Sequence, residues 1–430
     1  MREMKDSGIK WVPHIPTDWT TARLKNIIGI LTDYTANGSF ADLAKNVEYH
    51  DYEDYARLIR LTDLRDNLEN TGVYVSEESY EYLGKSKLFG GEILVANVGA
   101  YAGLFCEMPT IGLPSTLGPN MFLIRTNDRM TSHYLYYLGN AHFVWEQLVQ
   151  KAFSSAQPKL NKTDVKTVYI VMPPLQEQKK IATYLDAKCA EIDALAADIQ
   201  TQIDTLEQYK RSVITEAVTK GLKPDVEMKD SGIQWIGMMP SHWDCIRGKY
   251  ILKYIQKPVR EDDGVITCFR DGEVTLRSNR REDGFTMADK EIGYQGIDVG
   301  DLVVHGMDGF AGAIGISDSR GKASPVLNVL NTKQNKRYIM YFLRSMAYSD
   351  VFLALATGIR VRSCDLRWNK LAELFYPVPP IEEQDAIVQH IDDVLYKANE
   401  VIAQKKDQLS VLEAYKKSLI FEYVTGKKEV

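Results

Sequence analysis

Two short segments each occur twice in this chain, and this duplication is the feature that most limits the folds it can adopt. MKDSGIKW begins at Met4 and returns as MKDSGIQW at Met228. PPLQEQKKIA begins at Pro173 and returns as PPIEEQDAIV at Pro379. Because both segments follow the same order in the two halves, we interpret the chain as a tandem duplication of one structural plan.

The PP segments mark the predicted starts of two long helices. Proline is tolerated in the first helical turn, and Glu177 and Glu383 stand where the helix dipole favours negative charge. Apolar residues recur behind them at an average spacing of about 3.5 residues, which predicts a coiled-coil seam. Gly221 and Gly426 are typical of helix ends. An ordinary packed helix hairpin is the alternative interpretation.

The register of the coiled coil can also be predicted. Helices related by a pseudo-two-fold axis run antiparallel, so facing residues share a constant sum of residue numbers. A sum of 607 places Gln202 opposite Lys405, whereas a sum of 600 would bury Lys405 against Leu195 at a desolvation cost. We therefore predict the 607 register, with the seam residues Leu195, Gln202, Leu206, Tyr209, Ala398, Val401, Lys405 and Leu412.

The segments between the repeated motifs predict two α/β domains. GGEILVANVG at Gly90 and VGDLVVHGMDG at Val299 are short β-rich runs bounded by glycines, and we interpret them as the same element in each copy. The expected fold class is α+β, with two such domains separated by two long helices in an antiparallel coiled coil. The expected boundaries are 1–172 for the first domain, 173–222 for the first helix, 223–378 for a linker and the second domain, and 379–430 for the second helix.

Motifs that would support catalysis are incomplete. The segments MPPL and VPPI lack the polar residue before the prolines and the aromatic residue after them that amino-methyltransferases use. GFAGAIG at Gly309 lacks the glycine spacing of a nucleotide-binding loop. The seven histidines form neither an H-x-x-x-H nor an H-E-x-x-H set. We therefore expect no catalytic residue, no metal site and no cofactor of the chain's own.

Cysteines and hydropathy indicate the expected compartment. The five cysteines are scattered and form no C-x-x-C pair, which argues against a disulfide framework or a zinc site. No apolar run approaches the roughly 20 residues of a membrane helix, and the N-terminus lacks the apolar core of a signal peptide. The expectation is a cytoplasmic protein without a membrane partner.

The order of these motifs resembles a known protein family. In each half a tryptophan-containing signature is followed by a variable block and then by a PP segment, VMPPLQEQKKIA or PVPPIEEQDAIV. This order resembles the specificity subunit of type I restriction-modification systems, and the resemblance covers essentially the whole chain. It implies that each variable block is a target-recognition domain reading one half of a split sequence in double-stranded DNA. It also implies that the helices dock modification subunits, of which two are expected.

The resemblance assigns the chemistry to partner subunits. A methyltransferase would modify adenine with S-adenosylmethionine, and restriction subunits would act as an ATP-driven motor-nuclease with Mg²⁺. The family's base-reading residues differ between members, so none can be transferred to this chain. A coiled-coil scaffold that assembles other proteins and does not read DNA is the alternative function.

Clusters of basic and amide side chains are the candidate DNA contacts. The net charge of −6 argues against a protein coated in basic surface, so local clusters have to provide the contacts. Arginine pairs with guanine and glutamine with adenine, while most lysines and arginines contact phosphates. Solvated loops are the ordinary interpretation of such clusters. The candidates are Lys85, Lys87, Ser154, Gln157, Lys159 and Lys162 in the first block, and Arg277, Arg280, Arg281, Arg320, Lys322, Arg360, Arg362 and Arg367 in the second.

Overall fold

The computed structural model describes residues 2–152, 158–280, 292–355 and 366–430. The chain forms two compact units: Met1–Asp198 with Asp407–Val430, and Ile199–Lys406. Each unit combines one mixed α/β domain with a segment of both long helices, α7 (Leu175–Lys220) and α12 (Ile381–Val424). The predicted fold class is therefore confirmed, and both helices begin directly after their PP dipeptide.

The first unit opens with the repeated signature, which forms the hairpin of β1 (Met4–Ile9) and β2 (Val12–Pro16). The further strands are β3 (Thr20–Arg23), β4 (Ile28–Asp33), β5 (Ala56–Ile59), β6 (Tyr74–Val75), β7 (Lys87–Leu88), β8 (Ile93–Ala96), β9 (Phe105–Glu107), β10 (Ser115–Leu117), β11 (Met121–Thr126) and β12 (Tyr169–Met172). The helices before α7 are α1 (Phe40–Asn46), α2 (Leu61–Arg65), α3 (Glu77–Tyr82), α4 (Ser132–Asn140), α5 (His142–Ala152) and α6 (Lys162–Lys166).

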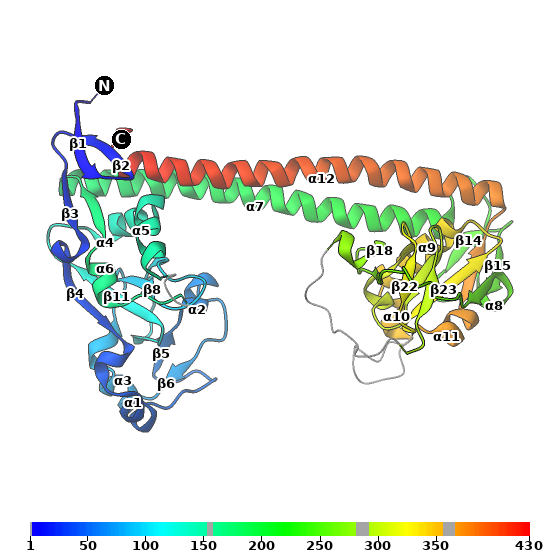
Figure 1. Cartoon of the computed structure of the whole chain (residues 1–430), viewed down its shortest axis with the longest axis horizontal. Helices are drawn as coiled ribbons and strands as arrows, with labels where there is room; N and C mark the ends of the chain where they lie inside the picture. The colour runs from blue at the N-terminus through cyan, green and yellow to red at the C-terminus, as the bar shows by residue number, and fades with distance from the viewer. Residues whose placement is uncertain (1, 153–157, 281–291, 356–365) are drawn as a thin grey trace. The chain divides into compact units, whose positions relative to one another are not determined.

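Two four-stranded sheets form the body of the first unit. One has the antiparallel order β4-β11-β8-β9, and the other has the order β6-β5-β10-β7, in which β5 and β10 are parallel. Strands β3 and β12 form a separate antiparallel pair. The main core contains Trp19, β8, β11 and α4 together with apolar side chains of α7 and of the C-terminal part of α12. In this unit the C-terminal part of α12 lies beside the N-terminal part of α7 (Figure 1).

The second unit repeats this plan. Its strands are β13 (Met228–Asp230), β14 (Met238–Pro240), β15 (Asp244–Arg247), β16 (Leu252–Ile255), β17 (Ile266–Cys268), β18 (Val274–Leu276), β19 (Gln295–Ile297), β20 (Leu302–His305), β21 (Ile314–Ile316), β22 (Gly321–Ala323), β23 (Leu327–Thr332) and β24 (Phe375–Val378). Its helices before α12 are α8 (Gly248–Ile251), α9 (Lys336–Tyr348), α10 (Val351–Ala354) and α11 (Trp368–Glu373).

Strand order shows that the two domains share one topology. The sheet β16-β23-β20-β21 corresponds strand by strand to β4-β11-β8-β9. The pairs β17–β18 and β19–β22 are joined by a parallel bridge between Val265 and Lys322, which matches the second sheet of the first unit. Strands β8 and β20 occupy equivalent places, so the prediction that the runs at Gly90 and Val299 are one element is confirmed.

The repeated motifs hold each domain on its helices. In the first unit the side chain of Gln178, which is fully buried, accepts a hydrogen bond from the Thr131 amide at 2.9 Å. It also donates to the carbonyls of Arg129 and Pro173. The Tyr134 hydroxyl donates to the carbonyl of Val424 at the end of α12. The glutamine of the PP motif is therefore a structural residue.

The second unit has the same contacts at equivalent residues. The buried Gln384 side chain accepts from the Asn335 amide at 2.9 Å and donates to the Pro379 carbonyl at 2.8 Å. The Tyr338 hydroxyl donates to the carbonyl of Val218 at the end of α7. Each domain is therefore tied to the start of one long helix and to the end of the other.

Glycines at the ends of the long helices pack against the signature tryptophans. Gly426 has a φ of +71°, and a Cβ added there would lie 2.5 Å from Pro16 and 3.2 Å from Trp19. Gly221 has a φ of +75°, and an added Cβ would lie 3.1 Å from Trp243. Both positions therefore require glycine for conformation and for space.

Contacts between the helix segments agree with an antiparallel pairing inside each unit. In the second unit Lys405 donates a hydrogen bond to the side-chain oxygen of Gln202, which is the pair expected for the 607 register. In the first unit the rings of Tyr184 and Tyr423 lie 4.5 Å apart, and Lys416 pairs with Asp193 at 2.6 Å. In these contacts, α7 residues with higher numbers pair with α12 residues with lower numbers, as expected for antiparallel helices.

Three of the eight predicted seam residues are exposed, so the seam prediction is wrong at these positions. Leu195, Tyr209 and Val401 have exposed fractions of 48%, 51% and 39%, and of the other predicted members only Ala398 is buried. Ile203, which neighbours the predicted Gln202, is buried, as are Cys189 and Ala182, two and three heptads before it. Hydropathy alone favoured the large apolar Leu195, which the structure leaves exposed.

Candidate nucleic-acid interface

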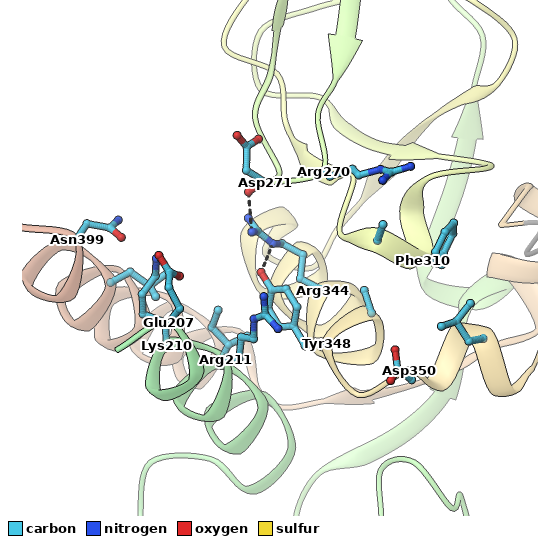
Figure 2. Close-up of a pocket in the computed structure, with 15 residues that line it drawn as sticks. Glu207, Lys210, Arg211, Arg270, Asp271, Phe310, Arg344, Tyr348, Asp350 and Asn399 are labelled. Atoms are coloured by element: carbon cyan, nitrogen blue, oxygen red, sulfur yellow. Dashed lines mark hydrogen bonds and ion pairs between the residues drawn. The ribbon is translucent and has the colours of Figure 1, made fainter. Parts of the chain in front are cut away.

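The second unit contains a group of adjoining cavities whose linings combine basic side chains with the acidic residues Glu207, Asp271, Asp308 and Asp350. The first, of about 640 Å³, lies between α7, α9, α12 and the turn at Asp271 (Figure 2). The second, of about 490 Å³, and the third, of about 260 Å³, adjoin it through Arg270, which lines all three. We call their cationic lining the basic face, which consists of Lys210, Arg211, Arg270, Arg277, Arg280 and Arg344.

The turn between β17 and β18 organises the centre of the basic face. Arg280 pairs with Asp271 at 2.6 Å and with Glu273 at 3.1 Å, and its guanidinium lies 4.2 Å from the ring centre of Phe269. The hydrogen bond to Asp271 raises the pKa of Arg280 above its ordinary value. Burial raises the pKa of Asp271, but hydrogen bonds from Arg280 and the Glu273 amide outweigh burial and lower it. Both groups are therefore charged at neutral pH.

A stacked set of side chains connects this turn to the helices of the same unit. Arg344 donates to the Asp271 carbonyl at 2.7 Å and to the Tyr348 hydroxyl at 2.8 Å (Figure 2). The guanidinium of Arg211, on α7, lies 5.3 Å from the ring centre of Tyr348. The basic face therefore includes residues of the long helix as well as residues of the domain.

His305 shapes the hairpin tip next to the basic face. Burial lowers the pKa of its imidazole, so the ring is neutral at pH 7. Its Nδ1 accepts hydrogen bonds from the amides of Met307 and Asp308, which leaves the proton on Nε2. The ring thereby fixes the backbone at the start of the tip that joins β20 to β21.

The chemistry of the basic face suits a large anion. Arg270 pairs with Asp308 at 2.9 Å and Lys210 with Glu207 at 2.9 Å, and the Arg270 side chain is 68% exposed. An exposed pair such as Arg270–Asp308 contributes about 0–1 kcal/mol, so a phosphate group could replace the Asp308 carboxylate at small cost. Among the described residues, no cluster of His, Cys, Asp or Glu could hold a metal ion. No described helix is long and apolar enough to cross a membrane.

The described candidate residues of the first domain are all bonded to residues of that domain. Lys85 donates to the Ala36 carbonyl at 3.0 Å, and Lys87 pairs with Glu81 at 2.6 Å. Lys162 pairs with Asp33 at 2.9 Å, while Lys159 forms a backbone bridge with Val98. Ser154 and Gln157 lie outside the described residues.

Candidate residues of the second domain divide into three groups. Arg277 and Arg280 belong to the basic face. Arg320 pairs with Asp263 at 2.9 Å and also with Asp298, and these ion pairs favour a structural role. Lys322 lies in β22, and Arg367 precedes the first residue of α11. Arg281, Arg360 and Arg362 lie outside the described residues.

Sequence reasoning missed Lys210, Arg211, Arg270 and Arg344. Arg270 precedes Asp271-Gly272, and a DG pair between two β-rich runs is a recognisable hairpin signal. Arg344 and Arg211 lie within helical segments, where nothing in the local sequence separates them from ordinary exposed arginines. They adjoin Arg270 only in the folded unit.

Comparisons with known proteins agree with this architecture. Residues 16–205 match the family model described as "Type I restriction modification DNA specificity domain". The type I restriction enzyme MjaVIII specificity subunit of Methanocaldococcus jannaschii is 23% identical, over 97% of this chain and 94% of that protein. The type I restriction enzyme EcoBI specificity subunit of Escherichia coli is 22% identical, over 99% of this chain and 90% of that protein.

One solved structure, described as the structural basis of complex assembly and conformational transition of the type I R-M system, contains a chain with the same fold. It superposes with a TM-score of 0.66 at 15% identity and covers 96% of this chain and 99% of its own length. Residues 16–205 are thus similar to the DNA specificity domain of type I restriction-modification systems, and along its whole length the chain is similar to their specificity subunits.

Proposed function

We propose that this chain is the DNA-reading subunit of a type I restriction-modification complex, in which each domain reads one half of a split DNA sequence. The observation that carries the proposal is the pair of domains with one strand order. The same repeated residues tie both domains to the helices, whereas the exposed residues around them differ. Two similar frames with different surfaces are suited to two different half-sites.

The chemistry of modification and cleavage belongs to partner subunits in this proposal. An adenine methyltransferase would supply S-adenosylmethionine, and a restriction subunit would supply ATP hydrolysis and Mg²⁺-dependent cleavage. Of the sequence motifs, the repeated PP-x-x-E-Q motif is the most similar to a catalytic motif. Its glutamine forms structural hydrogen bonds in both units. We therefore assign no catalytic residue to this chain.

The long helices provide surfaces for the methyltransferase subunits. In the first unit they expose Leu195 and Tyr415, and in the second unit they expose Val401 and Tyr209. These residues form equivalent pairs, because Leu195 and Val401, like Tyr209 and Tyr415, are 206 positions apart. Large apolar side chains repeated at exposed positions favour protein docking. We assign one methyltransferase subunit to each unit.

Exchange of one domain tests the proposed function. Residues 20–172 would be replaced by the corresponding segment of a relative, and DNA bound by the chain with its methyltransferase partner would be selected from a random library. We expect the unaltered protein to select a two-part sequence, and the exchange to change one part only. A change in both parts, or in neither, would contradict reading by separate domains.

The same selection separates the alternative function. A coiled-coil scaffold would assemble with its partners normally and would enrich no sequence. The basic face favours DNA reading over this alternative, because a scaffold needs no group of six cations that the domain and α7 bring together in one unit.

A further inference from the structure

Equivalent hairpins stand beside the central strand of each domain. The β8–β9 hairpin spans Ile93–Glu107 and the β20–β21 hairpin spans Leu302–Ile316. Their tips close in the same way, because the Ala102 amide donates to the Gly99 carbonyl at 3.0 Å and the Ala311 amide to the Asp308 carbonyl at 2.9 Å. Gly103 and Gly312 follow with φ of +99° and +95°.

The same neighbouring segments support both tips. The Leu160 amide donates to the Asn97 carbonyl at 2.8 Å, and the Leu366 amide donates to the Gly306 carbonyl at 2.8 Å. The backbone of each tip is therefore held on both sides by the domain. A fixed two-stranded ribbon has the dimensions to enter the major groove of DNA.

The side chains on the two tips differ although their frames agree. The first tip reads NVGAY from Asn97 to Tyr101, and the second reads GMDGF from Gly306 to Phe310, with Ala-Gly following in both. Tyr101 is 45% exposed and Met307 is 52% exposed. Large exposed apolar groups on a rigid tip are expected where a partner covers them.

An arginine accompanies each tip. In the first unit the guanidinium of Arg65, at the end of α2, lies 3.9 Å from the ring centre of Tyr101. In the second unit Arg270 and Met307 line the cavity of about 260 Å³ together with Phe310. Arg65 and Arg270 both follow equivalent strands, β5 and β17. Each tip thus presents an arginine and a large apolar side chain together.

Each unit also contains an arginine–aromatic pair that belongs to the repeated frame. Arg23 lies 5.0 Å from the ring centre of Tyr169, between β3 and β12. Arg247 lies 5.1 Å from the ring centre of Phe375, between the equivalent strands β15 and β24. These pairs are alike in both units and line none of the three cavities of the basic face, so they serve as matched controls.

We propose that the two hairpin tips are the specificity-determining elements, with Arg65 and Tyr101 contacting the bases of one half-site and Arg270 and Met307 those of the other. The inference rests on the proposed function and names the residues that perform it. Arginine donates two hydrogen bonds to guanine, and apolar side chains contact the thymine methyl group or a base face. Different tips on one frame then read different sequences.

The test uses the full chain assembled with its methyltransferase partner and DNA selected from a random library. The variants are Arg65→Ala and Tyr101→Ala for the first tip, and Arg270→Ala and Met307→Ala for the second. We expect each variant to lose preference at particular base pairs of one half-site, by about 5- to 150-fold, and to keep the other half-site. The control variants Arg23→Ala, Tyr169→Ala and Arg247→Ala should select the wild-type sequence.

The outcomes separate this inference from the proposed function. If the wild-type complex selects no two-part sequence, the proposed function is wrong. If it does, and the tip variants select the same sequence as wild type or lose affinity uniformly for every sequence, the tips do not read bases. Should an alanine variant fail to fold, Arg65→Lys and Arg270→Lys keep the charge without the two-pronged hydrogen bonds. These variants should retain non-specific affinity and lose the base preference, and an unchanged preference would overturn the inference.

Discussion

At the scale of single residues, the buried glutamines of the PP motif hold the domains on their helices. We expect Gln178→Ala to lower the free energy of unfolding by about 2–3 kcal/mol, because it leaves the Thr131 amide and two carbonyls without partners. Urea titration followed by circular dichroism measures the change. The exposed Gln200, whose amide donates to Asp204 at 2.9 Å, is the control, and Gln200→Ala should cost less than about 0.5 kcal/mol. Equal losses would show that burial of the amide is unimportant.

His133 provides a pH-dependent contact in the first unit. Its ring bridges Glu107 on β9 and Asp186 on α7, at 2.5 Å and 2.7 Å. Burial lowers the pKa of His133, but the hydrogen bonds to Asp186 and Glu107 outweigh burial and raise it above 6.5. The stabilisation is therefore complete below the unfolded pKa of about 6.5 and is lost as the pH rises through the folded pKa.

We expect the stability difference between wild type and His133→Gln to be larger at pH 6 than at pH 9. The side chain is 41% exposed, so solvent screening keeps the effect below about 1 kcal/mol. The second unit supplies the control, because Arg337 occupies the equivalent place and pairs with Asp392 at 2.6 Å. The cost of Arg337→Gln should be the same at both pH values, since arginine stays charged. A pH-independent cost for His133→Gln would contradict the assignment.

At the scale of elements, the long helices separate seam residues from surface residues only three positions apart. Ile192 is buried in the core of the first unit, whereas Leu195 is exposed on the same helix. We expect Ile192→Ala to cost about 2–4 kcal/mol and Leu195→Ala less than about 0.5 kcal/mol in urea unfolding. A larger cost for Leu195→Ala would show that the Leu195 side chain is packed in the seam.

At the scale of the whole molecule, the repeated surface residues predict the stoichiometry of assembly. Tyr415→Asp should remove the methyltransferase subunit of the first unit and Tyr209→Asp that of the second, because a buried carboxylate disfavours docking. Native mass spectrometry should then show one methyltransferase subunit per chain in place of two. The matched control is Tyr396→Asp, since Tyr396 is also an exposed tyrosine on α12 but has Ala190 at its equivalent position. Loss of both subunits from a single variant would contradict independent docking.

The sequence by itself determined the plan of this protein. Repeated motifs and heptad spacing are local signals, because a proline fixes a backbone angle and an apolar period specifies one helix face. They therefore sufficed to predict two long helices, two equivalent α/β domains and the pair of Gln202 with Lys405. They could not show that Leu195 is exposed, because an apolar period specifies a helix face but not which of its apolar residues are covered in the folded unit.

Only the tertiary structure decided the composition of the basic face. Arg211, Arg270 and Arg344 are far apart in the chain and adjoin one another because α7, α9 and the β17–β18 turn fold into one unit. Arg320 belonged to an equally basic sequence cluster, but Asp263 and Asp298 hold it in ion pairs. The sign and place of a charge can be read from sequence, whereas its partner depends on long-range packing that no local pattern encodes.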